Sequence, residues 1–306
     1  MFKTFPEFTK LTSKDREEYE AYVKHFPPVS DIAFPSLMLW WDGVGETAVS
    51  VLNDNLVISY WIPGDEAHSG LSLIGSNKVD ESICVIFDYL RDRGERPRLV
   101  NVPDFVIDNL RYPELFQFKT DGGDDEYIIS LQRFARIEQL PQHMRISIRK
   151  FVRAFGEDAL QVKNLNLRLE HNRQLLQDTS EQWPLKGVNN MTKRGREVFP
   201  LSVQKGPHLG MRCAGLFVHG ELEAYCLYFH TNDKRYVTLA HARVNYEIPR
   251  IFGYMVHALA NHLVGSGARF ANIYSDNGSL KMRAIKIALR PDHFFRKYSI
   301  EPAPSR

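Results

Sequence analysis

The chain has 306 residues, of which 43% are hydrophobic and 25% charged, the composition of an ordinary globular protein. No apolar run reaches the roughly 18 residues that a membrane-spanning helix needs, and the first residues lack the apolar block of a secretory signal. We therefore expect a cytoplasmic protein that could reach a membrane only by peripheral contact. The three cysteines are scattered without paired CxxC motifs, which predicts buried side chains and no metal site.

The net charge of +2 hides an asymmetry between the two halves. Residues 1–130 carry 12 Lys/Arg and 23 Asp/Glu, whereas residues 131–306 carry 27 Lys/Arg and 14 Asp/Glu. Either the halves attract each other across a domain contact, or the second half meets a polyanion such as tRNA, an anionic lipid or a phosphorylated cofactor. Composition alone leaves both interpretations open.

The first half reads as a helix, three strands, a helix and a strand. Ser13 begins a capped helix that ends before Pro27. Residues 48–54 and 55–63 flank an Asn-Asp-Asn turn and predict a hairpin, and residues 69–75 supply a third strand. An amphipathic helix over 78–94 and a strand over 96–103 follow.

The second half repeats this order without repeating the sequence. Strands at 211–218, 221–229 and 235–244 form a meander, followed by a helix over 248–267 and a strand over 268–276. We predict an α+β fold of two tandem lobes, each a mixed, mostly antiparallel sheet flanked by helices. The lobes comprise residues 1–130 (acidic) and 131–306 (basic, with the candidate active site).

The region between the lobes contains the helix PQHMRISIRKFVRAFG, which has a stripe of arginines. At 100° per residue, Arg145, Arg149 and Arg153 fall within 80° of one another, and apolar residues occupy the opposite side. This stripe is either a solvated surface or a contact for an anionic donor.

The stretch SDNGSLKMRAIKIALRPDHFFRKY follows the last strand of the meander lobe. Alternation places Asn272, Tyr274 and Asp276 on one side of that strand, and Arg283 and Lys286 share a face of the next helix. Ligands bind beyond the carboxyl ends of strands in open sheets, which makes this a candidate site. The alternative is a surface helix with a salt bridge from Asp276 to Arg283.

These residues resemble the tail of the lysylphosphatidylglycerol synthetase C-terminal-domain family, which includes many bacterial proteins. The tail matches lie at Asp276, Gly278, Arg283, Lys286, Pro291, Lys297 and Tyr298. The segment SDIAFPSLMLWW and the junction DDEYIISLQRFARIEQLPQHMRISIRKF are similar to two further family elements, and HARVNYEIPRIFGYMVHALANHL to a third. The resemblance therefore touches both halves in the expected order.

The resemblance implies two tandem acetyltransferase-like (GNAT-type) folds, related to enzymes that transfer an aminoacyl group from tRNA. It implies an acyl or aminoacyl transferase with a polyanionic donor and a small amine or hydroxyl acceptor, without a metal. GNAT-type folds that bind coenzyme A usually carry a glycine-rich loop after the meander. Here that place reads RVNYEIPRIFGY, which favours aminoacyl-tRNA over acyl-CoA as the co-substrate.

We assign roles to eight residues as hypotheses. Asp276 and Tyr274 orient the acceptor amine, Asn272 binds the substrate or donor, and Glu247 is a general base or amine anchor. Arg283 and Lys286 contact the donor phosphate or the acyl carbonyl, and Arg149 and Arg153 hold the anionic donor.

Two other readings stay open. Because the junction and tail depart from the family's usual motifs, one alternative is a non-catalytic ligand-binding or regulatory protein that keeps the fold. The other is a protein that binds nucleic acid through the arginine stripe alone, with affinity that falls steeply with salt.

Overall fold

The computed structural model describes residues 1–41, 45–64, 66, 69–120, 122–183, 193–231 and 233–304. The chain divides into two compact units that are discontinuous in sequence. Unit 1 consists of Met1–Glu126, Ser275–Arg283 and Phe294–Arg306, and unit 2 consists of Tyr127–Tyr274 and Ala284–His293. Whereas the sequence analysis assigned every residue after 130 to one lobe, two C-terminal segments return to unit 1.

Unit 1 contains a seven-stranded sheet with the order β1-β2-β3-β4-β5-β14-β6. Its strands are β1 (Thr9–Lys10), β2 (Glu46–Leu52), β3 (Asn55–Trp61), β4 (Gly70–Ile74), β5 (Leu99–Pro103), β6 (Phe116–Lys119) and β14 (Lys297–Pro302). The helices of its first segment are α1 (Arg16–Val23), α2 (Phe34–Ser36), α3 (Val79–Asp92) and α4 (Asp104–Ile107). Strands β2, β3 and β4 form an antiparallel meander, β4 and β5 are parallel, and β14 pairs antiparallel with β5 and β6.

Local sequence explains the first elements of this sheet. Asn53 and Asp54 have positive φ values of 51° and 63°, which a two-residue turn between right-twisted strands requires. Helix α3 buries Ile83, Ile86, Phe87 and Leu90, a spacing that places apolar side chains on one face. That face belongs to the same apolar core as β3, β4, β5 and β14.

The second seven-stranded sheet has the order β13-β7-β12-β11-β10-β9-β8. Its strands are β7 (Glu126–Ser130), β8 (Leu160–Leu165), β9 (Arg212–Val218), β10 (Glu221–His230), β11 (Tyr236–Val244), β12 (Phe270–Asn272) and β13 (His293–Phe295). The helices are α5 (Leu131–Ala135), α6 (Gln142–Phe155), α7 (Glu170–Gln182), α8 (Lys193–Lys205), α9 (Ile251–Gly265) and α10 (Leu280–Ala288). Strands β8 to β11 are antiparallel, and β12 is parallel to β11 but antiparallel to β7.

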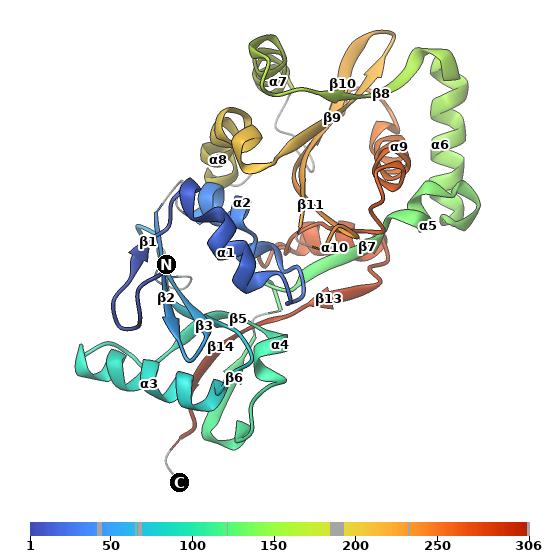
Figure 1. Cartoon of the computed structure of the whole chain (residues 1–306). Coiled ribbons are helices and arrows are strands. Elements are labelled where there is room, and N and C mark those ends of the chain that lie inside the picture. The colour runs from blue at the N-terminus through green and yellow to red at the C-terminus, as the bar shows by residue number, and fades with distance from the viewer. Residues whose placement is uncertain are drawn as a thin grey trace. The chain divides into compact units, whose positions relative to one another are not determined.

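Helices cover both faces of the β9–β11 meander in unit 2. Figure 1 shows α6 and α9 on one side of these strands and α7 and α8 on the other. On the α6/α9 side, Cys226, Tyr228 and Val244 share a core with Phe151 and Leu259. Alternate side chains of β10 and β11 therefore meet different helices, and polar residues on the α7/α8 side are buried as well.

In the part of the chain that the structure describes, no helix is both long and apolar enough to cross a membrane.

Candidate functional site

Strands β11 and β12 diverge at their carboxyl ends. They pair in parallel from Tyr236 opposite Phe270 to Thr238 opposite Asn272, where β12 ends, whereas β11 continues to Val244. Beyond β12 the chain keeps its hydrogen bonds to β7: Ile273 N donates to Tyr127 O at 3.0 Å. Adjacent strands of an open sheet that separate in this way create the position at which ligands bind.

A β-bulge lies directly beyond the point of divergence. Leu227 of β10 is opposite His241, but Tyr228 is opposite Leu239, so Ala240 is an extra residue in β11. Bulges bend a strand, change the direction of its side chains, and occur often beside active sites. The bulge is therefore a second reason to place the site at this end of β11.

Two of the predicted residues, Asn272 and Lys286, stabilise the chain just after β12. Asn272 is buried, and its Oδ1 accepts a hydrogen bond from Tyr274 N at 2.9 Å. Lys286 of α10 is only 6% exposed, and its ammonium donates to the carbonyl oxygens of Ile273 and Tyr274, the latter at 2.9 Å. The same ammonium lies 5.5 Å from the centre of the Tyr127 ring. Lys286 thus holds the backbone at the end of the strand.

Asp276 and Arg283 form an ion pair in unit 1. The guanidinium donates from Nε at 2.8 Å and from Nη2 at 3.2 Å to the buried carboxylate, and Nη2 also donates to Gly122 O. Gly278 N donates to Asp276 Oδ1 at 2.9 Å, so the carboxylate also fixes the turn before α10. The salt bridge that the sequence analysis weighed against a ligand role is present.

The other predicted residues lie on different elements. Arg149 and Arg153 are exposed on α6, opposite its buried residues Met144, Ile148 and Phe151. Glu247 is exposed in the segment that links β11 to α9. The predicted residues therefore fall into contacts that hold the end of β12 in unit 2, an ion pair in unit 1, an arginine stripe on α6, and an isolated carboxylate.

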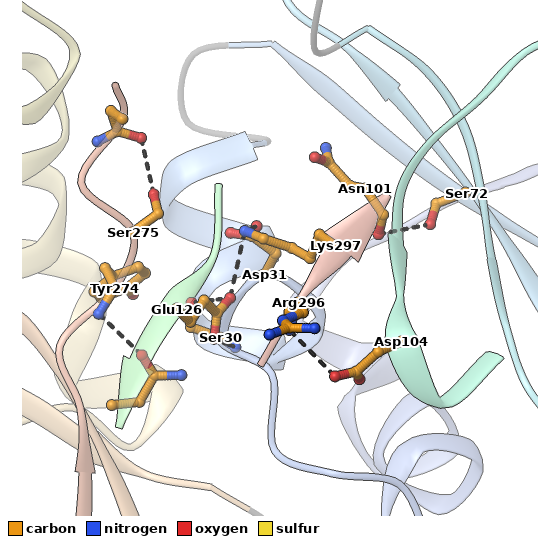
Figure 2. A network of polar contacts seen from close by, with 12 residues as sticks. Ser30, Asp31, Ser72, Asn101, Asp104, Glu126, Tyr274, Ser275, Arg296 and Lys297 are labelled. Atoms are coloured by element: carbon orange, nitrogen blue, oxygen red, sulfur yellow. Dashed lines mark hydrogen bonds and ion pairs between the residues drawn. The ribbon is translucent and has the colours of Figure 1, made fainter. Parts of the chain in front are cut away.

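Sequence reasoning missed a buried ionic network in unit 1, which Figure 2 shows. The ammonium of Lys297 contacts the carboxylate of Asp31, and it lies 3.5 Å from Glu126 Oε1. Glu126 also accepts hydrogen bonds from the N and Oγ of Ser30, both at 2.8 Å. Burial alone would lower the pKa of Lys297, but Asp31 and Glu126 outweigh it and raise that pKa above its usual range. Lys297 lies in the tail motif and Asp31 in the segment SDIAFPSLMLWW. No pattern within either segment indicates that these two residues form a pair.

A second buried charge, Arg243, lies on β11 in unit 2. It is 2% exposed, and its Nη1 donates to the carbonyl oxygen and the hydroxyl of Ser180, while Nη2 donates to Trp183 O at 3.3 Å. These groups lie at the C-terminal end of α7. The hydrophobic alternation of RYVTLAHARV could have revealed that Arg243 shares a strand face with His241, but not that helices cover this face.

His241 is buried two residues before Arg243. Its Nε2 lies 3.0 Å from Ser202 Oγ of α8, and Phe199 packs edge-on against its ring. Burial lowers the pKa of His241 to about 3, so the imidazole is neutral near pH 7. The α7/α8 side of β11 therefore carries one full positive charge, that of Arg243, beside a neutral histidine.

Within the described ranges, no group of three or more His, Cys, Asp or Glu side chains is arranged to hold a metal ion. The link between β11 and α9, residues 245–250, contains no glycine.

The chain has the tandem GNAT-type fold that the sequence predicts. It superposes on a tandem GNAT protein from the clavulanic acid biosynthesis pathway with a TM-score of 0.50 and 12% identity, over 98% of this chain and 99% of the other. No family model and no curated protein matches the sequence.

Two other solved structures share this fold over nearly their whole length. One is a conserved protein of unknown function from Bacteroides thetaiotaomicron, with a TM-score of 0.75, 18% identity and coverage of 96% of this chain and 98% of the other. The other is the C-terminal domain of a protein described as a lysylphosphatidylglycerol synthetase from Agrobacterium fabrum (TM-score 0.64, 14% identity, 96% and 93% coverage). At the level of the fold, these similarities confirm the resemblance found in the sequence.

Proposed function

We propose that the chain is a transferase that moves an acyl or aminoacyl group from a polyanionic donor to an amine or hydroxyl acceptor. The observation that carries this proposal is the divergence of β11 from β12, with the bulge at Ala240 beside it. The fold shared with a synthetase domain and with a GNAT protein supports a transferase in general.

The chemistry requires three elements near the diverging strands. A donor carbonyl must be held in place, a nucleophilic amine or hydroxyl must lie against its carbon, and dipoles must stabilise the negative oxygen that develops. The acceptor nitrogen or oxygen forms the new bond to carbon as the donor's ester or thioester bond breaks, and the acceptor proton leaves with a base. We assign Glu247 one of two roles: it accepts that proton, or it anchors the amine.

The contacts around β12 give the remaining residues a positioning role in this proposal. In unit 2, Lys286 and Asn272 fix the backbone at Tyr274, and in unit 1 the Asp276–Arg283 pair fixes the turn before α10. Because their charged groups already contact the protein, they act on the ligand through this backbone.

We assign the donor to the arginine stripe, since Arg149 and Arg153 are exposed and pair with no described carboxylate. The link without glycine between β11 and α9 favours aminoacyl-tRNA over acyl-CoA, because a glycine-rich loop that brings backbone N–H groups to a pyrophosphate is missing there.

The test is a transfer assay with a panel of radiolabelled aminoacyl-tRNAs and acyl-CoAs and a mixture of small amines and alcohols, followed by mass spectrometry of the products. Glu247→Gln is the informative variant, because its carboxylate is exposed and its loss should not affect folding. We expect aminoacyl transfer by the wild-type chain and at least tenfold less by the variant. Transfer from acyl-CoA alone would overturn the donor assignment.

A non-catalytic ligand-binding or regulatory protein is the second candidate. It is favoured by the internal contacts of Asp276, Arg283 and Lys286, which engage the charges expected to touch a substrate. Retention of a ligand in native mass spectrometry, with no product from any donor, would support this candidate over the transferase.

A further inference from the structure

Asn277 and Gly278 form the one Asn-Gly pair of the sequence, and both residues are exposed. An asparagine followed by glycine is especially prone to deamidation, because glycine has no side chain that keeps its backbone nitrogen away from the asparagine amide. The proposed function gives Asn277 no role. The pair is therefore a candidate site of covalent modification.

The reaction needs only water as a co-reactant. The Gly278 nitrogen forms a bond to Cγ of Asn277 and loses its proton to hydroxide, while the Cγ–Nδ2 bond breaks and the amide nitrogen takes a proton from water and leaves as ammonia. Water then adds to one of the two carbonyl carbons of the succinimide ring, and the bond from that carbon to the Gly278 nitrogen breaks, which restores the N–H. The product is an aspartate, or an isoaspartate whose backbone runs through the side chain.

The turn around this pair holds the reacting nitrogen away from its target. Asn277 and Gly278 have positive φ values of 49° and 71°, and Ser279 N donates to Asp276 O at 3.0 Å, which defines a type I′ turn. In such a turn the Gly278 nitrogen points away from the Asn277 side chain. Ser275 Oγ donates to Asn277 Oδ1 at 3.0 Å, so the amide is held as well. The reaction therefore requires the turn to open.

The ion pair between Asp276 and Arg283 keeps this turn closed. Asp276 Oδ1 accepts a hydrogen bond from Gly278 N at 2.9 Å, and the same oxygen accepts one from Arg283 Nη2 at 3.2 Å. A carboxylate that accepts the amide hydrogen also opposes its removal, because a negative nitrogen would form beside a negative oxygen. One buried carboxylate thus restrains both the movement and the deprotonation of the reacting nitrogen.

We propose that Asn277 is a deamidation site that the Asp276–Arg283 pair protects, and that opening of this pair commits the chain to an irreversible change of the turn. Isoaspartate adds a carbon atom to the backbone before Gly278, so the Gly278 nitrogen no longer reaches Asp276 Oδ1 in the geometry of a two-residue turn. Both products add a negative charge one residue away from the buried carboxylate. The modification therefore weakens the contacts that lead the chain into α10.

The test follows Asn277 by mass spectrometry of peptides from the full chain, incubated under mildly alkaline conditions. We expect Asn277 to react at least tenfold more slowly in the folded wild-type chain than in the same chain unfolded by guanidinium chloride. Arg283→Ala should react at least tenfold faster than the wild type, and Arg283→Lys, which keeps the charge, should lie between them. Asn109 is exposed but precedes Leu110, and it should stay intact in every sample.

Ile300→Ala is the matched control for a general loss of stability. It removes a buried side chain from the core of unit 1 and leaves the contacts of the turn in place. If the turn opens locally, Arg283→Ala reacts faster than Ile300→Ala, whose rate stays near that of the wild type. Equal rates in the two variants would overturn the inference, and so would an Arg283→Ala rate equal to that of the wild type.

Two measurements need no variant that folds. One is the comparison of folded and unfolded wild-type chains, in which equal rates would contradict protection by the turn. The other is hydrogen exchange at the Gly278 amide, which should be at least tenfold slower in the folded chain although the residue is exposed. Exchange at the unfolded rate would show that Asp276 does not hold this nitrogen. None of these measurements involves group transfer, so their outcome is independent of the proposed function.

Discussion

Asp276 is a buried carboxylate that forms an ion pair with Arg283. This contact determines how a variant of either residue should be interpreted. Removing the guanidinium leaves a buried negative charge without its ion pair. Because the Arg283 side chain is 39% exposed, solvent screens part of the interaction. We expect Arg283→Ala to lower the free energy of unfolding by about 1–3 kcal/mol, measured by urea denaturation.

The matched control for this prediction is the double variant Asp276→Asn/Arg283→Ala. Since a neutral amide is less costly to bury than an unpaired carboxylate, part of the lost stability should return. Equal stability of the two variants would show that the ion pair does not determine the effect. Loss of activity in Arg283→Ala alone would therefore not identify a group that touches the ligand.

His241 should make the stability of unit 2 depend on pH. Its pKa is about 3 in the folded chain and near 6.5 in the unfolded chain. Between these values the unfolded chain binds the extra proton, so stability falls as the pH drops below about 6.5, by at most about 1.4 kcal/mol per pH unit. His241→Gln removes this titration and retains a polar side chain beside Ser202.

The measurement is the free energy of unfolding of both chains at pH 7, 5.5 and 4.5. Other titrating groups affect both proteins, so the difference between them isolates His241. We expect the wild-type chain to lose stability relative to the variant at each step toward acid. Parallel pH profiles would contradict the buried, neutral state of this histidine.

At the scale of elements, the stripe on α6 predicts a measurable salt dependence. If Arg149 and Arg153 contact phosphates, affinity for tRNA should fall with rising salt, and Arg149→Ala/Arg153→Ala should make the log–log slope shallower by roughly 0.7–0.9 for each lost contact. Arg91→Ala/Arg93→Ala on unit 1 removes the same charge from ion-paired residues and should leave the slope unchanged. Equal effects of both pairs would indicate a general charge effect.

The elements that sequence predicts well are those whose signals are local. The β2–β3 hairpin follows from its turn residues, α3 from its apolar spacing, and the β9–β11 meander from alternation. Strand β7 lies in the sheet of unit 2 beside β12, and no local pattern specifies such a distant partner. The arginine stripe of α6 was predictable because it depends only on the spacing of residues within one helix. The burial of Arg243 was not predictable, because it depends on helices that are distant in sequence.

At the scale of the whole molecule, β14 connects the last residues of the sequence to the sheet of unit 1. Ile300 is fully buried in that unit's core, so Ile300→Ala should destabilise unit 1 by about 2–5 kcal/mol. We expect hydrogen exchange to accelerate in β5 and β6, which flank β14, and to remain unchanged in β9–β11. Ile287→Ala removes an exposed side chain of α10 and serves as the control. Faster exchange in both sheets would instead show that the two units unfold together.

The position of β14 between β5 and β6 also has a consequence for synthesis on the ribosome. Strands β5 and β6 emerge early, but the strand that joins them is translated about 180 residues later, a delay of roughly 10–35 s at 5–20 residues per second. Until then each of these strands presents an unpaired edge to other nascent chains. The sheet whose strands are translated first therefore cannot be completed until the last strand of the chain has been made.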